Sequence, residues 1–148
     1  MSSAELISYA VVAGSTIAIV VGCVLLHYEA LSKLTGWLKR IHIRPRPRIL
    51  VMILSLLVIH VVEIWVFGIG YWALTLDASH GVLRGPHTVG LLDCVYYSAV
   101  CYTTLGLGDF APVGNIRFMT GMESLAGFLL IGWSVSFTYL EMDRFWRG

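Results

Sequence analysis

The sequence has few charged residues. Asp, Glu, Lys and Arg make up only 13% of its 148 residues, whereas 57% are hydrophobic. A soluble domain usually carries about 25% charged residues, so this chain lacks the polar groups to cover its surface in water. The composition favours an integral membrane protein whose surroundings are membrane lipids.

Other features that are missing exclude several classes of function. Three cysteines, at positions 23, 94 and 101, do not make a disulfide framework, and we interpret them as packing residues. The sequence shows no Gly-rich phosphate loop, metal-ligand spacing or catalytic-triad spacing, so we predict no enzyme and no organic cofactor. No apolar stretch repeats Arg at every third position, which argues against a voltage sensor of the usual kind.

Basic residues gather in one place. Residues 33–48 contain six basic residues and no acidic residue: Lys33, Lys39, Arg40, Arg44, Arg46 and Arg48. A basic run can bind nucleic acid, but this one is short and lies between two apolar stretches, so we predict a cytoplasmic loop and no nucleic-acid partner. The opposite side of the membrane has only Arg84 and Arg117. We therefore expect the N-terminus outside and the C-terminus in the cytoplasm, with no soluble partner evident.

Three long apolar stretches predict membrane-spanning helices, because about 20 apolar residues cross a hydrocarbon core of about 30 Å. They lie in residues 1–30, in an outer helix at 49–76 and in an inner helix at 116–140. Between the first two, residues 31–48 predict a basic cytoplasmic linker that begins as an amphipathic stretch in the inner headgroup layer. Residues 143–148 predict a short cytoplasmic tail.

A shorter apolar stretch lies between the second and third spans. Residues 77–90 predict a polar outer loop, and residues 91–102, about 18 Å long if helical, are too short to cross the membrane. They suit a re-entrant helix that dips in from the outside, followed by the segment 103–109 and a turn at 111–115. The fold class we predict is an all-α membrane protein with three transmembrane helices and one re-entrant helix.

The segment after the re-entrant helix reads Thr103-Thr104-Leu105-Gly106-Leu107-Gly108-Asp109. It is a poor helix sequence, and a membrane interior forbids unpaired backbone unless that backbone is buried in protein or lines a water-filled path. A dehydrated cation can use such carbonyls. Alternating glycines, which tolerate positive φ, let successive carbonyls turn to one side. The pattern predicts a cation path lined by backbone carbonyls.

This segment resembles the potassium-channel signature Thr-Val-Gly-Tyr-Gly-Asp with its preceding threonine. The surroundings are also similar: a short helix precedes it, a proline turn follows it, and residues 115–127 resemble the inner helix of small bacterial two-transmembrane channels. The resemblance covers residues 49–140, within a pore domain at 49–142, and the first span is an addition to the two-helix plan.

The resemblance implies a homotetramer in a bacterial inner membrane that conducts potassium passively through a central pore. The potassium ions would bind the backbone carbonyls of Thr104, Leu105, Gly106 and Leu107, with the Thr104 hydroxyl at the innermost site. Gly106 and Gly108 match the two invariant glycines of the signature, and Asp109 matches the acid behind the outer mouth. Thr103, Tyr96 and Tyr97 would support the filter, and Gly127 lies where the family has its inner-helix hinge.

Two departures leave alternatives open. Leu107 stands where the family has tyrosine, and Tyr96 and Tyr97 stand where it has tryptophans. A weakly selective channel that passes some sodium is therefore one alternative. A non-conducting accessory subunit is another, and a membrane-embedded enzyme or transporter that uses Glu63 and Glu123 is a third.

Ionisable residues inside the spans are costly and often functional. Glu63 and Glu123 are either a proton-sensitive pair that supports the filter, or structural ties that are protonated or bonded to the backbone of the re-entrant helix. We interpret His60 as a satisfied packing residue. His80 and His87 in the outer loop fit a solvated loop, with metal binding or pH sensing as the alternative.

Overall fold

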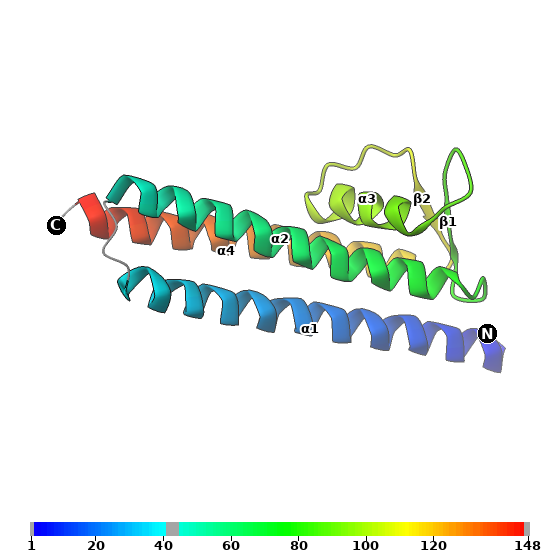
Figure 1. The fold of residues 1–148 in the computed structure, drawn as a ribbon. Coiled ribbons are helices and arrows are strands. Elements are labelled where there is room, and N and C mark those ends of the chain that lie inside the picture. Colours follow the sequence, from blue (N-terminus) through cyan, green and yellow to red (C-terminus); the bar gives the residue numbers. More distant parts are fainter. Residues whose placement is uncertain (1, 41–44, 147–148) are drawn as a thin grey trace.

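The computed structural model describes residues 2–40 and 45–146. Along the chain its elements are α1 (Ser3–Arg40), α2 (Pro45–Thr75), β1 (Val82–Arg84), α3 (Leu91–Tyr102), β2 (Ala111–Val113) and α4 (Arg117–Trp146). The long helices α1, α2 and α4 run side by side, and α3 lies at the end of the bundle where the chain begins (Figure 1). Each long helix is apolar and long enough to cross a membrane, which confirms the predicted fold class.

Helix α1 extends well beyond the predicted span. It runs without a break to Arg40, through the first part of the region predicted to be a linker. Leu31, Leu34 and Leu38 are buried against Met52 and Leu56 of α2. Their spacing puts them on one face of a helix. This face packs on protein rather than lying in the headgroup layer, and residues 41–44 of the predicted linker lie outside the described residues.

Helices α2 and α4 also extend beyond their predicted ends. Helix α2 begins at Pro45, not at residue 49. Proline is compatible with the first turn of a helix, where the backbone N–H groups have no acceptor within the helix. Helix α4 continues to Trp146, through most of the predicted tail. There the Arg144 Nη1 atom donates to Glu141 Oε1 at 2.7 Å.

The short helix α3 has the predicted bounds of 91–102. It begins at a cap in which the Gly90 N–H donates to Asp93 Oδ2 at 2.7 Å. Glycine allows it to approach both of its long neighbours closely. A Cβ built on Gly68 of α2 would overlap Val95, and one built on Gly127 of α4 would overlap the Tyr102 carbonyl. Helix α3 is therefore wedged against α2 and α4.

The outer segments contain a two-stranded sheet where the sequence predicted only a loop and a turn. Strands β1 and β2 pair antiparallel, with Val82 opposite Val113 and Arg84 opposite Ala111. Pro112 is tolerated in β2 because both strands of such a sheet are edges. After β2, Gly114 turns the chain with a φ of 86°. The sheet pairs the outer loop before α3 with the residues that directly follow the segment 103–109.

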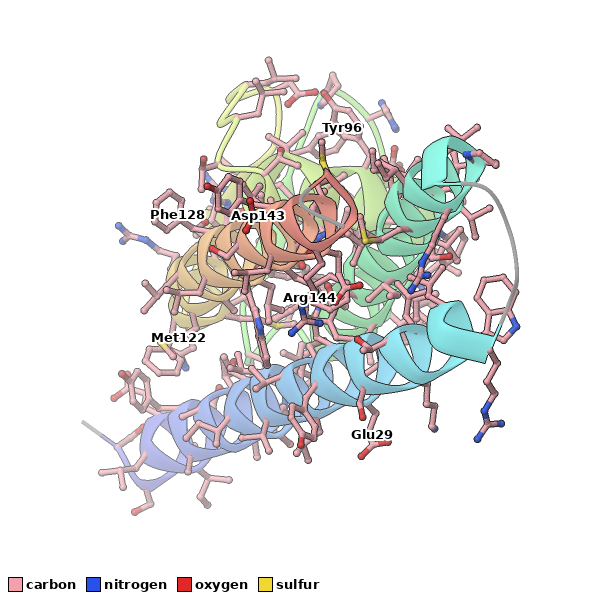
Figure 2. All side chains as sticks on the ribbon, turned by 90° about the vertical axis from the view of Figure 1, so that its left-hand side faces the viewer. Glu29, Tyr96, Met122, Phe128, Asp143 and Arg144 are labelled. Atoms are coloured by element: carbon pink, nitrogen blue, oxygen red, sulfur yellow. The ribbon has the colours of Figure 1, made fainter. Side chains whose placement is uncertain are left out.

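Helix α1 and the segment 103–109 lie on opposite sides of the bundle. Both views place α1 on one side of α2 and α4, with the yellow-green loop after α3 on the other (Figures 1 and 2). The outer end of α1 is attached by Ser8, whose Oγ donates to the Ser79 carbonyl at 2.8 Å and accepts from Asn115 Nδ2 at 3.0 Å. The added helix is thus firmly attached but distant from the segment 103–109.

Candidate functional site

The segment 103–109 begins on the last turn of α3. The Thr104 N–H donates to the Cys101 carbonyl at 2.9 Å, and the Leu105 N–H donates to the Val100 carbonyl at 3.0 Å. The Gly106 N–H also reaches the Val100 carbonyl, at 3.4 Å. The carboxyl end of α3 therefore sets where this segment starts and in which direction it leaves.

The backbone of the segment alternates in handedness. Thr104, Gly106 and Gly108 have φ values of 58°, 60° and 80°, whereas Leu105 and Leu107 between them have no positive φ. Among the described residues, Thr104 is the one non-glycine residue with positive φ. This conformation is a genuine outlier for a β-branched residue and costs roughly 1–3 kcal/mol. An alternating backbone of this kind can turn successive carbonyls to one side, which a helix does not.

Nothing in the described part of the chain covers this segment. Residues 103–109 are all exposed, and the side chains of Leu105 and Leu107 are 63% and 58% exposed. Between the segment, α3 and α4 lies a hollow of about 310 Å³ whose lining includes Thr104, Gly106 and Gly108. A single chain thus leaves the signature segment open.

The two tyrosines predicted to support the segment lie in different surroundings. The nearby Asp109 carboxylate raises the pKa of the Tyr96 phenol. The Tyr96 ring lies 5.9 Å from that of Phe110. Tyr97 points into the bundle, where its hydroxyl lies 3.0 Å from Thr120 Oγ1. Tyr96 thus holds the outer end of the segment, and Tyr97 ties α3 to α4 beside the hollow.

Glu123 of α4 is fully buried among hydroxyl groups. The Tyr71 hydroxyl donates to Glu123 Oε2 at 2.7 Å. Ser98 Oγ is within hydrogen-bonding distance of Glu123 Oε1, and it also lies 2.8 Å from the Ile64 carbonyl oxygen. This group, which we call the Glu123 cluster, joins α2, α3 and α4.

Glu63 of α2 is equally buried, but its partners include two histidines. Its Oε1 lies 2.9 Å from His27 Nδ1, and its Oε2 lies 3.1 Å from His60 Nδ1 and accepts from the Tyr102 hydroxyl. The Nε2 atoms of His27 and His60 lie 3.2 Å and 3.0 Å from Ser134 Oγ. This group, which we call the Glu63 cluster, joins α1, α2, α3 and α4.

Of the alternatives that the sequence left open for the two glutamates, the structure does not show a bond to the backbone of α3. Each carboxyl group is tied to α3 by a side-chain hydroxyl, that of Ser98 or Tyr102, and not by the backbone of that helix. His60 is satisfied by partners, as interpreted from the sequence. His27 was missed because it was placed at the end of the first span, while its partner Glu63 is 36 residues away.

Gly127 lies against the carboxyl end of α3. It has a packing role, because α4 can approach the Tyr102 carbonyl this closely only where it carries no side chain. Its role as a gating hinge stays a prediction.

A family model described as "Ion channel" matches residues 48–141. The chain belongs to this ion channel family. No curated protein and no solved structure matches the chain. The residues that match this ion channel family take in most of α2, all of α3, the segment 103–109 and most of α4, and they leave α1 outside. An ion channel of this kind is a membrane protein, and membership supports the prediction that the chain is not an enzyme.

Proposed function

We propose that the chain is one subunit of a homotetrameric channel that conducts potassium passively. The observation that carries this is the alternating backbone of Thr104, Gly106 and Gly108 in an exposed segment at the end of a short helix. In the proposed ring, the carbonyls of residues 104–107 replace the hydration shell of potassium ions. The Thr104 hydroxyl forms the innermost site.

The exposed face of α4 supports a ring of identical subunits. A stripe spaced alternately by four and three residues comprises Gly121, Leu125, Phe128, Gly132, Val135 and Tyr139, all exposed in the single chain. This is the heptad spacing by which helices pack along a common seam. Phe128 points away from the other helices (Figure 2). In the proposed tetramer, copies of α4 pack along this stripe and bring the segments 103–109 together around one axis.

The end of α3 favours a cation. The carboxyl end of a helix carries a partial negative charge. Helix α3 ends at Tyr102, immediately before the proposed ion sites. The N-terminus of the chain lies at the same end of the bundle as α3 (Figure 1). With basic residues gathered near the other end, the proposed orientation in a bacterial inner membrane has the filter and N-terminus outside.

Cation flux into proteoliposomes tests the proposal. We expect potassium-dependent flux that barium blocks, and we expect Gly106→Ala to abolish it. In the single chain, no atom would obstruct the new methyl group. The substitution therefore acts through the backbone of residue 106, whose φ of 60° costs an L-residue about 1–2 kcal/mol in each subunit. The matched control is Gly14→Ala on α1, which also has open space. Absence of flux under any gradient would favour a non-conducting accessory subunit and overturn the proposal.

A weakly selective cation channel is the second candidate. One observation favours it: Leu107, which has no hydrogen-bonding side chain, is 58% exposed and lacks a polar tie to α3. Reversal potentials in mixed potassium and sodium decide between the two. We expect the reversal potential to show a preference for potassium. A reversal potential that does not change when sodium replaces potassium would establish the weakly selective alternative.

A further inference from the structure

The Glu63 cluster is a closed ring of hydrogen-bonding groups. Its contacts run from Glu63 to His27, on to Ser134 and His60, and back to Glu63 through Tyr102. Each of these five contacts needs one hydrogen. Two neutral histidines, one tyrosine and one serine supply four, and an ionised Glu63 supplies none. With neutral histidines and an ionised Glu63, the ring therefore lacks one hydrogen for its five contacts.

We propose that His27, His60 and Glu63 form a binding site for one divalent transition-metal ion of the zinc type. Each residue offers one ligand atom, and the three atoms lie within 4.8 Å of one another. Imidazole and carboxylate are typical zinc ligands, with bonds of about 2.0–2.2 Å. Neighbouring ligands of a tetrahedral ion are then about 3.3 Å apart. The Glu63 oxygens lie 2.9 Å and 3.1 Å from the two Nδ1 atoms, so small outward shifts would admit the ion.

A metal ion would also be compatible with the contacts of both Nε2 atoms and with the Tyr102–Glu63 hydrogen bond. With both Nδ1 lone pairs on the ion, each Nε2–H of the neutral histidines donates to Ser134 Oγ, which has two acceptor lone pairs. The Tyr102 hydroxyl donates to Glu63. Partners of this kind fix the orientation of metal-binding side chains. The site could not be predicted from the sequence, because its ligands come from positions 27, 60 and 63 on two helices.

One side of the site is open in the single chain. His60 and Ser134 line a hollow of about 470 Å³ between α2 and α4, and the His60 side chain is 16% exposed. His27 and Glu63 are fully buried behind it. Three protein ligands leave the fourth position of a tetrahedral ion to water. A bound ion would join α1, which lies outside the family match, to α2 beside the carboxyl end of α3.

Metal titration of the purified full chain in detergent tests the site and does not depend on conduction. After treatment with a chelator, we expect one cobalt(II) ion to bind per chain with the visible absorption of a tetrahedral complex. Zinc should displace it, and magnesium, which prefers oxygen ligands, should not. We expect His27→Gln and His60→Gln each to weaken cobalt binding at least tenfold, and Ser134→Ala to weaken it about 10–100-fold.

The matched control is His87→Gln, which removes an outer-loop histidine that contacts Asp93 and not the ring. It should bind cobalt as the unaltered chain does. Size-exclusion elution shows whether each variant is folded, and Ser134→Ala keeps the test decisive if a histidine variant does not fold. Failure of cobalt and zinc to reach one ion per chain would overturn the proposal, and so would unchanged affinity in folded Ser134→Ala and His60→Gln.

Discussion

The Glu63 and Glu123 clusters hold the same short helix in different ways. Among the described residues, Glu123 is hydrogen-bonded to the hydroxyl groups of Tyr71 and Ser98, and both partners lie within the residues that match the ion channel family. Glu63 meets two histidines as well as Tyr102, and one of them, His27, comes from α1. The comparison indicates that the first tie lies within the region that matches the ion channel family, while the second attaches α1 to that region.

Counting hydrogens separates the two carboxyl groups further. Ser98 has one hydroxyl hydrogen but two possible acceptors, the Ile64 carbonyl and Glu123. If Glu123 carries a proton and donates it to Ser98 Oγ, Ser98 can donate to Ile64, and all contacts are satisfied. Glu63 accepts from the Tyr102 hydroxyl through Oε2, and each of its two oxygens lies beside the Nδ1 atom of a histidine. We infer a neutral acid at Glu123 and an ionised acceptor at Glu63.

The largest expected effect comes from Glu63→Gln. The new amide N–H would face either the Tyr102 hydroxyl, which donates to Glu63, or a histidine Nδ1 atom, and the cluster would lose its carboxylate charge. Breaking such a buried tie costs about 3–5 kcal/mol. Thermal unfolding of the detergent-solubilised protein should show this as a large fall in Tm.

The control for Glu63→Gln is Glu29→Gln on the same side of the bundle. Glu29 points away from α2 and α4 (Figure 2), and its contact with Lys33 is an exposed pair at 3.7 Å. Exposed pairs contribute about 0–1 kcal/mol, so its Tm should stay close to that of the unaltered chain. Equal falls in Tm for both variants would contradict the distinction between a buried tie and a surface pair.

A pair of substitutions at Glu123 should have smaller, graded effects. Glu123→Leu leaves the Tyr71 hydroxyl without its buried acceptor, at about 1–3 kcal/mol. Glu123→Gln reproduces the shape and the donor of a protonated acid, so we expect it to cost less than Glu123→Leu. We also expect the pH dependence of cation flux to be unchanged by Glu123→Gln. A shifted pH profile would restore the proton-sensor interpretation of this residue, and a Gln variant less stable than the Leu variant would contradict the neutral acid.

The sequence predicted the parts of this structure that depend on local pattern. The bounds 91–102 of α3 followed from a short apolar run between a polar loop and a glycine-rich segment. The spacing of Leu31, Leu34 and Leu38 identified an apolar face correctly, but an amphipathic pattern does not say whether lipid or protein covers that face. Contact with Met52 and Leu56 of α2 became visible only in three dimensions.

The two glutamate clusters could be predicted from the sequence only in part. Burial at membrane depth made Glu63 and Glu123 stand out, yet in most contacts their partners are 25 or more residues distant and belong to ordinary residue types. A lone His27 in an apolar helix becomes informative only when Glu63 and Ser134 are seen beside it. The strands β1 and β2, three residues each, are too short to produce an alternating pattern.

Asp93, in the first turn of α3, is a third carboxylate that holds this helix, and it lies at an exposed site. Its substitution has the smallest expected effect. The Gly90 N–H, and then His87, lower the pKa of Asp93 from its ordinary value of 3.8. A lowered pKa means that the ionised group stabilises the folded start of the helix above pH 3.8, and that this stabilisation is lost as the pH falls through the lowered pKa.

The Asp93→Asn side chain cannot ionise, so we expect this substitution to remove the acid-dependent loss of stability. Deuterium uptake at the first turn of α3 should rise on acidification in the unaltered chain and stay level, relative to intrinsic exchange, in the variant. An acid-dependent rise of equal size in the variant would show that another group controls this end of the helix, and it would leave the two buried clusters as the main anchors of α3.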